Sequence, residues 1–376
     1  MLDVAAEVAW SHPDPDPEFF ATVVGSLPGV VRPHVVRVAR PGREPLVIVA
    51  RLEDIRLETK AGYRTVLRPR LRCLTVVNGG VEGVETAEDA AAALALLRSA
   101  LSGGEADVVR FLGLPTDSPL YRAATTIPPW LCRDHAAVPQ PHWRVSVPDT
   151  LEDFLGARSR NTRQNVNRYR KRFEKEYGGR LELRRYGAGF DEDLERLCAD
   201  LETVAAKSYQ RGLGVGFTGD ELQRRLMELG LRRGRYLAWV LDIDGTPSAF
   251  WDGTIHAATF FIGSPGYDPD FARHRIGTWL QMRMMEDLCA RDDVRALDYG
   301  MGDAQYKQSY GDECWMDAVV HVFAATPRGL RANAGRTAVN SATRTARRAL
   351  ARMGAEDRVK RMWRGRLQAG AQSGAE

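Results

Sequence analysis

The residues best suited to chemistry lie in one segment, DYGMGDAQYKQSYG, which spans residues 298–311. The segment follows a hydrophobic stretch typical of a strand, so its polar groups emerge at a strand's carboxyl end, where α/β proteins usually bind ligands. Gly300 and Gly302 allow a ligand to approach the backbone closely. The side chains that can accept protons, donate them or supply a positive charge are Asp298, Asp303, Tyr306 and Lys307. A glycine turn with solvated charges is the alternative interpretation.

A second candidate is a phosphate site in the segment FARHRIGTWL. Arg273, His274 and Arg275 precede a predicted helix whose first turn contains Gly277 and Thr278. Exposed backbone N–H groups at a helix start attract phosphate, so a pyrophosphate could bind there. Basic residues at this position oppose the helix dipole and need another reason to be present. An ordinary basic loop is the alternative.

Several common mechanisms lack their motifs in this chain. There is no G-x-x-x-x-G-K-[ST] phosphate loop and no G-x-S-x-G elbow, and the seven histidines show no metal-ligand spacing. A G-x-G-x-G at residues 212–216 follows a predicted helix, whereas a dinucleotide fingerprint must follow a strand. The five cysteines are far apart and form no C-x-x-C pair, which argues against a disulfide framework and a zinc site. We therefore expect reduced cysteines and no metal.

The elements that must position these residues begin with a loop, SHPDPDPEFF, and four strand-type runs. These are HVVRVAR, PLVIVARL, LRCLTVV and DVVRFLG, which are rich in Val, Leu and Ile. The segment TAEDAAAALALLRSALSGG between the last two predicts a helix capped by Thr86. Strands alternating with a helix indicate an α/β or α+β unit over residues 1–142.

The next region predicts three helices. The first, SRNTRQNVNRYRKRFEKEY, carries one apolar stripe on an otherwise basic helix: Val166, Tyr169, Phe173 and Tyr177. The second is DEDLERLCADLETVAAKSYQ. The third starts at a capping box formed by Thr218 and Glu221 and ends near Gly230.

From Tyr236 onward the pattern changes to sheet. YLAWVLD, PSAFWDG and HAATFFIG predict an antiparallel meander, followed by a helix over residues 277–291, the strand VRALDYG and a last strand MDAVVHVFA. Both halves thus show a meander, a helix and a strand, so they could be distant copies of one fold. The sequence predicts domains at 1–142 and 143–327, with a basic helical extension at 328–376.

Charge is unevenly distributed along the chain. The net charge is +4, with 53 basic and 49 acidic residues. Residues 158–185 carry eleven basic and three acidic side chains, a net +8, and residues 328–366 carry twelve and two, a net +10. The remainder therefore carries −14. This segregation of charge predicts an anionic partner. The small net charge of the whole chain would not by itself indicate one.

Composition limits the class of protein. The chain has 376 residues, of which 44% are hydrophobic and 27% charged, enough for two or three domains with cores. Its longest charge-free apolar run, residues 90–97, is far shorter than the roughly 18 residues of a spanning helix. The first ten residues lack the basic region of a secretory signal. We expect a soluble cytoplasmic protein without a membrane span.

Residues 143–325 resemble the acetyltransferase family associated with cellulose and exopolysaccharide biosynthesis, a branch of the GNAT superfamily that is also similar to Fem-type peptidyl transferases. The landmarks, in order, are HWRVSVPDTLEDFLGARSRNTRQNVNRYRKRFEK, SYQRGLGVGF, LDIDGTPSAF followed by GYDPDFARHRIGTWL, and DYGMGDAQYKQSYG. The N-terminal third matches more loosely, through LTVVNGGVEG. The resemblance implies a tandem GNAT-like fold with mixed central sheets flanked by helices. It also implies direct transfer of an acyl group, such as acetyl, from acyl-CoA to an amine or hydroxyl.

The resemblance further implies roles for individual residues. For the donor it implies a strand whose backbone pairs with pantetheine and a site for the CoA pyrophosphate: Phe260 and Ile262, then Arg273, Arg275, Gly277 and Thr278. For the reaction it implies an acid that protonates the departing thiolate, a neighbouring cation and a base: Tyr306, Lys307, and Asp303 or Asp298. For the acceptor it implies Arg158, Arg160, Arg163, Tyr209 and Trp251.

The phosphate loop departs from the superfamily's Q/R-x-x-G-x-G/A pattern, because Arg273 stands four residues before Gly277 and Trp279 occupies the final small position. A Fem-type aminoacyltransferase that uses charged tRNA is therefore the second enzyme hypothesis, and it fits both Arg-rich segments. The third is a non-catalytic protein whose basic segment 331–366 binds anionic lipid or nucleic acid. We expect a small-molecule or phosphorylated glycan-precursor acceptor as partner, with tRNA and an anionic membrane as alternatives. The oligomeric state is left open.

Overall fold

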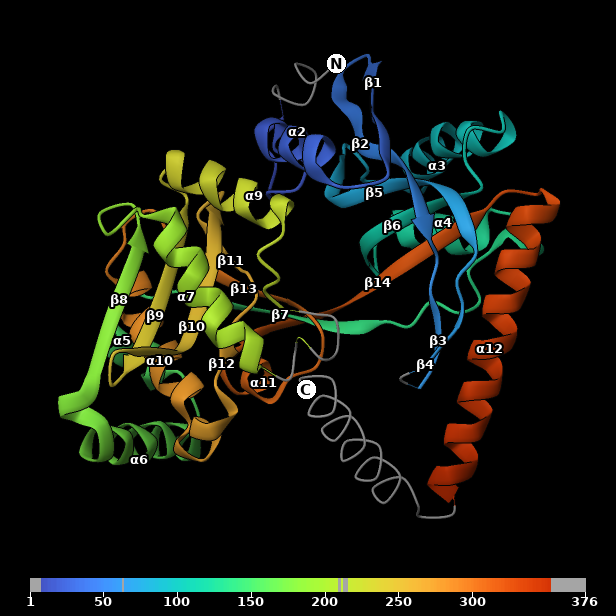
Figure 1. The fold of residues 1–376 in the computed structure, drawn as a ribbon. Helices are drawn as coiled ribbons and strands as arrows, with labels where there is room; N and C mark the ends of the chain where they lie inside the picture. The colour runs from blue at the N-terminus through green and yellow to red at the C-terminus, as the bar shows by residue number, and fades with distance from the viewer. Residues whose placement is uncertain (1–7, 63, 209–210, 212–215, 353–376) are drawn as a thin grey trace. The chain divides into compact units, whose positions relative to one another are not determined.

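The computed structural model describes residues 8–352 except 63, 209–210 and 212–215. The chain divides into two compact units, one made of residues 1–140 with 316–376 and the other of residues 141–315 (Figure 1). The first break lies two residues from the boundary predicted at 142. The segment after residue 315, which the prediction divided between the second domain and an extension, groups with the first unit.

Unit 1 contains one mixed sheet with helices on both faces. Its elements are α2 (Pro17–Ser26), β1 (Val30–Arg40), β2 (Arg43–Arg56), β3 (Thr59–Ala61), β4 (Arg64–Leu67), β5 (Arg70–Glu82), α3 (Ala87–Ser102), β6 (Val108–Pro115), α4 (Pro119–Thr126), η1 (Trp130–Cys132), β14 (Glu313–Phe323) and α12 (Pro327–Arg352). The strand order is β1-β2-β5-β6-β14, with a separate β3–β4 hairpin. Only β5 and β6 pair in parallel among these neighbours, and α3 connects them.

The sequence pattern explains most of unit 1. The four predicted strands are β1, β2, β5 and β6, and along β2 alternate side chains enter opposite cores, Ile48 with α3 and Val49 with α2. Helix α3 begins at the predicted Thr86 cap, where Asp89 completes a capping box. The predicted N-terminal loop was wrong in its second half. Asp16 caps helix α2, whose Phe20 is buried in the core.

Unit 2 has a second mixed sheet. Its elements are β7 (Gln140–Ser146), α5 (Leu151–Gly156), α6 (Arg160–Tyr177), η2 (Gly178–Arg180), β8 (Leu181–Gly187), α7 (Leu194–Lys207), α9 (Glu221–Arg232), β9 (Tyr236–Ile243), β10 (Thr246–His256), β11 (Thr259–Ile262), β12 (Gly266–Tyr267), η3 (Pro269–His274), α10 (Ile276–Cys289), β13 (Ala296–Met301) and α11 (Gln305–Tyr310). The strand order is β7-β13-β11-β10-β9-β8, and β12 pairs with β10. Strands β11 and β13 are parallel, and α10 connects them.

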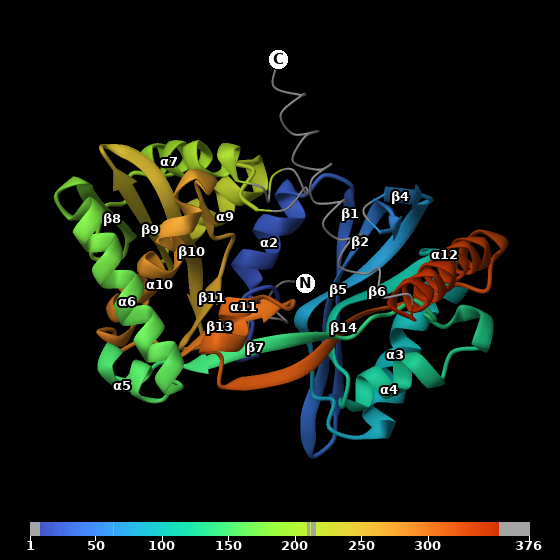
Figure 2. The ribbon, with the colours of Figure 1, turned by 90° about the horizontal axis from the view of Figure 1, so that it is seen from below.

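Helices cover both faces of the second sheet, as Figure 2 shows. Every residue of β9 is buried, and alternate side chains serve different cores. Leu237 and Trp239 pack with α6 and α10, whereas Ala238 and Val240 pack with α7 and α9. The basic helix α6 buries its apolar stripe as predicted, although Tyr169 is only partly covered.

Two local predictions in unit 2 need correction. Helix α9 is capped by Asp220 instead of Thr218, because the Asp220 carboxylate accepts the Gln223 N–H at 2.9 Å. The Thr218 hydroxyl instead bonds to that carboxylate. The segment after β13, predicted only as a short connection, contains helix α11.

The two units repeat one plan, as the predicted meander, helix and strand order suggested. In unit 1, and in unit 2 from β9 onward, two antiparallel pairings are followed by a parallel pairing across a helix and then by one more antiparallel strand. Unit 2 has β8 as an additional antiparallel neighbour of β9. Thus β1-β2-β5-α3-β6 corresponds to β9-β10-β11-α10-β13. The observed fold is the predicted mixed α/β architecture.

The basic segment after residue 327 is helical at its start, as predicted, and α12 packs within unit 1. Arg336 Nη1 donates to Asp134 Oδ2 at 2.7 Å, and His321 Nδ1 lies 2.9 Å from the same oxygen. The Asp134 side chain is fully buried. Burial alone would raise the pKa of Asp134, but the bonds from His321 and Arg336 hold it well below its usual value. No helix in the described residues is long and apolar enough to cross a membrane.

We predict that Asp134→Ala destabilises unit 1 by about 3–5 kcal/mol, because it leaves the largely covered Arg336 guanidinium without its carboxylate. Urea unfolding at pH 7 measures this. Asp117→Ala, at an exposed position of the same unit, should cost less than about 0.5 kcal/mol. Because the Asp134 pKa is lowered in the folded state, its stabilisation is present at neutral pH and begins to disappear below about pH 4. Equal effects of the two substitutions would contradict the prediction.

Candidate functional site

The start of helix α10 is open to an anion. Its N-cap residue, Arg275, has a left-handed backbone (φ 57°), and no side chain caps the helix. The first turn contains no acidic residue, and the Arg275 and Arg273 side chains are exposed. A Cβ at Gly277 would meet only the Tyr267 ring, at 3.7 Å. Arg273 Nε donates to His274 Nε2 at 2.6 Å, and the Arg275 guanidinium lies over the Tyr169 ring. Open backbone N–H groups next to two exposed arginines favour phosphate. Thr278, also predicted here, is partly exposed in the same turn.

The equivalent helix of unit 1 is closed. At the start of α3 the Asp89 carboxylate accepts the Thr86 N–H at 3.0 Å. It also pairs with Arg40 at 2.6 Å and Arg43 at 2.8 Å. A protein carboxylate thus already lies where the dipole and two arginines would hold an external anion. Of these two equivalent helices, whose starts both lie in the described part of the chain, α10 is open and α3 is closed.

Strands β11 and β13 separate beside this helix start. Their parallel pairing runs from Thr259–Ala296 to Phe261–Asp298 and goes no further, although β13 continues to Met301. The chain leaves β11 toward β10, where Gly263 N donates to Asp252 O at 2.8 Å. Phe260 is fully buried against Trp239, so only its backbone can meet a ligand. Ile262 is partly buried and packs on the same core.

The predicted reactive segment closes around the end of β13. The Asp298 carboxylate accepts the Gly300 N–H at 2.6 Å and lies 2.8 Å from His142 Nε2. Lys307 is buried, and its Nζ donates to the carbonyls of Gly300 at 3.1 Å and Met301 at 2.8 Å. Burial lowers the pKa of Lys307, and Asp298 partly opposes this effect. These contacts fasten α11 to the strand.

Tyr306 and Asp303 differ in exposure. The Tyr306 ring is partly buried and lies edge-on to Trp251 and Tyr299, with ring centroids 5.6 Å away in both pairs. Asp303 is exposed, and the Gln308 side-chain amide donates to its carboxylate. Of the two predicted carboxylates, Asp303 is therefore the one that solvent reaches more readily.

The predicted acceptor residues differ in their exposure and in their contacts. Arg158 is buried, its Nε donates to Phe154 O at 3.3 Å and its Nη2 to Asp312 at 3.4 Å. Arg163 donates to two backbone carbonyls before α6, whereas Arg160 is exposed at the first position of that helix. Trp251 is buried next to Tyr306. Tyr209 lies outside the described residues.

Helix α6 presents a largely basic stripe to solvent. The stripe comprises exposed residues spaced by three or four positions, so that they share one face: Arg160, Gln164, Arg168, Lys171 and Lys175. Both acidic residues of α6 are paired elsewhere, Glu174 with Arg283 and Glu176 with His274. In the described part of the chain no carboxylate contacts the stripe.

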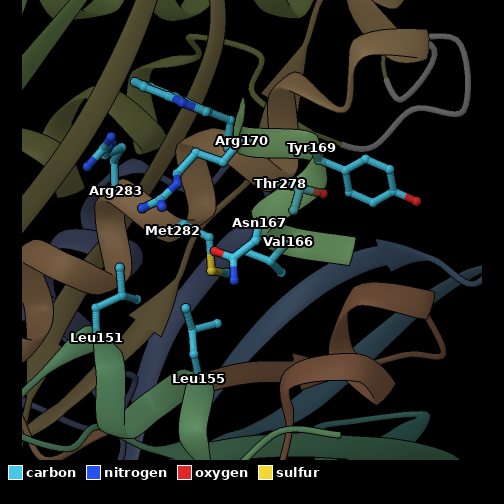
Figure 3. Close-up of a pocket in the computed structure, with 10 residues that line it drawn as sticks. Leu151, Leu155, Val166, Asn167, Tyr169, Arg170, Thr278, Met282 and Arg283 are labelled. Carbon is cyan, nitrogen blue, oxygen red and sulfur yellow. The ribbon is translucent and has the colours of Figure 1, made fainter. Parts of the chain in front are cut away.

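A pocket of about 20 Å³ lies between α5, α6 and α10. Figure 3 shows its residues: Leu151, Leu155, Val166, Asn167, Tyr169, Arg170, Thr278, Trp279, Met282 and Arg283. The space is close to that of a single water molecule. It is therefore too small for an acyl chain or a nucleotide. A larger pocket, of about 580 Å³, lies in unit 1 where β5 and β6 begin, at the opposite strand ends from those that flank the start of α3.

Several residues around the site were not predicted. His142 reaches Asp298 from β7 and stacks on Trp315. Tyr299 was seen only as part of a strand, and Gln281 only as part of a helix. Their neighbours in space are distant in sequence, so no local spacing signalled the contacts.

We predict that Arg275→Gly is more stable than Arg275→Ala by about 1 kcal/mol, because only glycine adopts a left-handed backbone without strain. Thermal unfolding of both variants measures this. Both remove the same charge, so they should weaken phosphate binding equally. If alanine proves at least as stable as glycine, the left-handed N-cap is not strained.

Residues 160–308 match the family model of the acetyltransferase (GNAT) domain. The match includes the open start of α10, the separating strands and Tyr306. No curated protein sequence matches the chain significantly.

Solved structures support the fold. The chain is similar to the crystal structure of FemX, with a TM-score of 0.51 and 10% identity over 82% of this chain and 96% of that one. It is also similar to the C-terminal domain (DUF2156) of a putative lysylphosphatidylglycerol synthetase from Agrobacterium fabrum, with a TM-score of 0.50 and 12% identity over 88% and 94% of the two chains. At these identities the similarity shows the fold alone. Residues 160–308 of the chain therefore resemble an acetyltransferase (GNAT) domain, and this match supports a GNAT-type acyltransferase.

Proposed function

We propose that this acyltransferase moves an acyl group, such as acetyl, from acyl-CoA directly to an amine or hydroxyl. The observation that carries the proposal is the uncapped start of α10, where Arg273, Arg275 and the open position at Gly277 suit a pyrophosphate. The separation of β11 from β13 leaves backbone groups beyond Phe261 available to pantetheine.

The reaction needs three contributions from the chain. The acceptor's nitrogen or oxygen attacks the thioester carbon, the new N–C or O–C bond forms, and the C–S bond breaks. Backbone N–H groups stabilise the oxyanion. The acceptor's proton passes to Asp303 through water, and the Tyr306 hydroxyl protonates the departing thiolate and is reprotonated by solvent. Asp298 is engaged by His142 and Gly300, so we assign it to the support of β13.

The acceptor we propose is a phosphorylated glycan precursor. Arg160 and the stripe it begins on α6 are exposed and carry no carboxylate partner within the described residues, so they suit phosphate on an acceptor. The resemblance to the exopolysaccharide-associated family favours a glycan carrier of that phosphate.

We predict that Tyr306→Phe lowers kcat about 10²-fold or more and leaves the KM for acetyl-CoA nearly unchanged, because the acid acts on the leaving group and not on donor binding. Release of free thiol from acetyl-CoA, with a panel of amines, alcohols and sugar phosphates as acceptors, measures turnover. Tyr310→Phe, four residues later on α11, is the matched control and should retain activity. Wild-type kcat in Tyr306→Phe would remove the acid role. Failure of acetyl-CoA to raise the melting temperature would argue against CoA as donor.

The stripe on α6 also favours a second candidate, an aminoacyltransferase whose donor is carried by tRNA. The stripe is about 22 Å long, at 1.5 Å per residue, and α6 packs against α10 and η3 at the proposed donor site. Its apolar side is buried within unit 2, so α6 cannot insert that side into a bilayer. These features suit a phosphate backbone better than a membrane.

For this candidate, replacing Arg168, Lys171 and Lys175 together with Gln should reduce the salt dependence of tRNA affinity by about two to three units of log–log slope. Filter binding of charged tRNA between 50 and 300 mM salt measures the slope. Gln at Arg225 and Arg232 of α9 is the control. Weak, salt-independent tRNA binding by the wild type would eliminate the tRNA donor and leave acyl-CoA.

A further inference from the structure

We propose that Trp251, Tyr299 and Gln281 are positioning residues that hold Tyr306 in its proton-donating orientation. This inference rests on the proposed acid role of Tyr306. None of the three was expected to act in this way, since Trp251 was assigned to the acceptor and the other two to no role.

The first observation is that the Tyr306 ring contacts two aromatic rings. Trp251 comes from β10 and Tyr299 from β13, and each ring centroid lies 5.6 Å from that of Tyr306. The interplanar angles are 88° and 75°, so both contacts are edge-to-face. Such pairs contribute about 0.5–1.5 kcal/mol each beyond the burial of area, and they depend on orientation. Together they restrict rotation of the Tyr306 ring.

The second observation is that both rings are fixed to one face of helix α10. Trp251 Nε1 donates to Gly277 O at 3.3 Å, and Gln281 Nε2 donates to the Tyr299 hydroxyl at 3.1 Å. Gly277 and Gln281 are four residues apart, so they lie on the same side of the helix. Tyr299 and Gln281 are each 1% exposed. In so buried a place a polar group needs its partner, so the two side chains fix one another.

The third observation is that α11 itself cannot shift freely. Lys307, the residue after Tyr306, is bonded to the carbonyls at the end of β13. The backbone beside Tyr306 is thereby attached to β13, and its ring is held by residues attached to α10. The start of α10 is also the proposed phosphate site. The geometry therefore sets the distance from the bound donor to the acid through a few buried side chains.

This arrangement gives a specific kinetic expectation. We call Trp251, Tyr299 and Gln281 together the bracket. If the bracket only stabilised the fold, a substitution in it would lower kcat equally for every donor. If the bracket positions an acid, the substitution should lower kcat for donors whose thiolate needs a proton to leave. It should leave kcat nearly unchanged for donors whose thiolate leaves without one.

The experiment compares acetyl-CoA with an acetyl thioester of an aromatic thiol, whose thiolate is a better leaving group. We expect Tyr299→Phe and Gln281→Leu each to lower kcat for acetyl-CoA about tenfold, to leave its KM unchanged, and to lower kcat for the aromatic thioester less than twofold. Because both remove one bond, the double variant should be no slower than either single variant. In a Tyr306→Phe background, Tyr299→Phe should cost nothing further.

Tyr186→Phe is the matched control. Tyr186 is equally buried in unit 2, and its hydroxyl donates to Asp200 at 2.7 Å on the other side of the sheet. Because the Tyr186 hydroxyl also accepts from Arg184 Nη1 at 2.9 Å, Tyr186→Phe should lower the melting temperature at least as much as Tyr299→Phe does, with kcat unchanged.

Two outcomes overturn the inference separately from the proposed function. Equal losses for the two donors, or an added loss on the Tyr306→Phe background, would show that the bracket does not act through Tyr306. If Tyr306→Phe itself keeps wild-type kcat, Tyr306 is not the acid, and the inference that depends on this role is also wrong. If Gln281→Leu fails to fold, Tyr299→Phe carries the test alone.

Discussion

Two parallel neighbouring strands must be joined by a crossover, and between β11 and β13 that crossover is helix α10. The connection begins at the carboxyl end of β11, so the start of α10 lies at that edge of the sheet. Strand β13 ends at the same edge, and α11 with Tyr306 follows it at once. The proposed phosphate site and the proposed acid are therefore neighbours because of one parallel pairing. This topology brings Tyr306 close to the helix start, and the edge-to-face contacts with Trp251 and Tyr299 then orient its ring.

The same pairing occurs in unit 1, yet it does not create a second open site. Sequence differences at a single helix start decide this. Thr86 and Asp89 cap α3 and leave Arg40 and Arg43 paired internally. At α10 the corresponding turn has glycine, no acid and a strained basic N-cap. Both copies of the repeated fold thus place a helix start next to two arginines. At α3 a carboxylate of the protein occupies this place, whereas at α10 it stays open to a ligand.

The net charge of +4 conceals how charge is used. On α6 the two glutamates form ion pairs with side chains of α10 and η3, so the exposed stripe is left almost purely basic. On α12, by contrast, Arg336 forms an ion pair with the buried Asp134 side chain, and Arg344 donates to a backbone carbonyl. The two basic segments look alike in sequence, but they serve different purposes where they are described. One is a surface, and the other helps to hold unit 1 together.

The sequence by itself determined the elements and the neighbourhood of the site. Runs rich in Val, Leu and Ile predicted β1, β2, β5 and β6, and the stripe from Val166 to Tyr177 predicted α6. The polar segment that begins within β13 supplied the candidates from Asp298 to Lys307. These features are local, so hydrophobic period, capping and turn residues suffice to find them. Helix α2 was not predicted, because the alternating Pro and Asp residues before it are typical of a loop. Asp16 caps this helix, and the burial of Phe20 in the tertiary core stabilises it. Tertiary structure alone decided that Trp251 and Tyr299 both contact Tyr306, that Lys307 turns inward to two carbonyls, and that Arg158 is buried. Each of these depends on side chains far apart in sequence meeting in a packed core, where close packing and the need to satisfy buried polar groups select the partner.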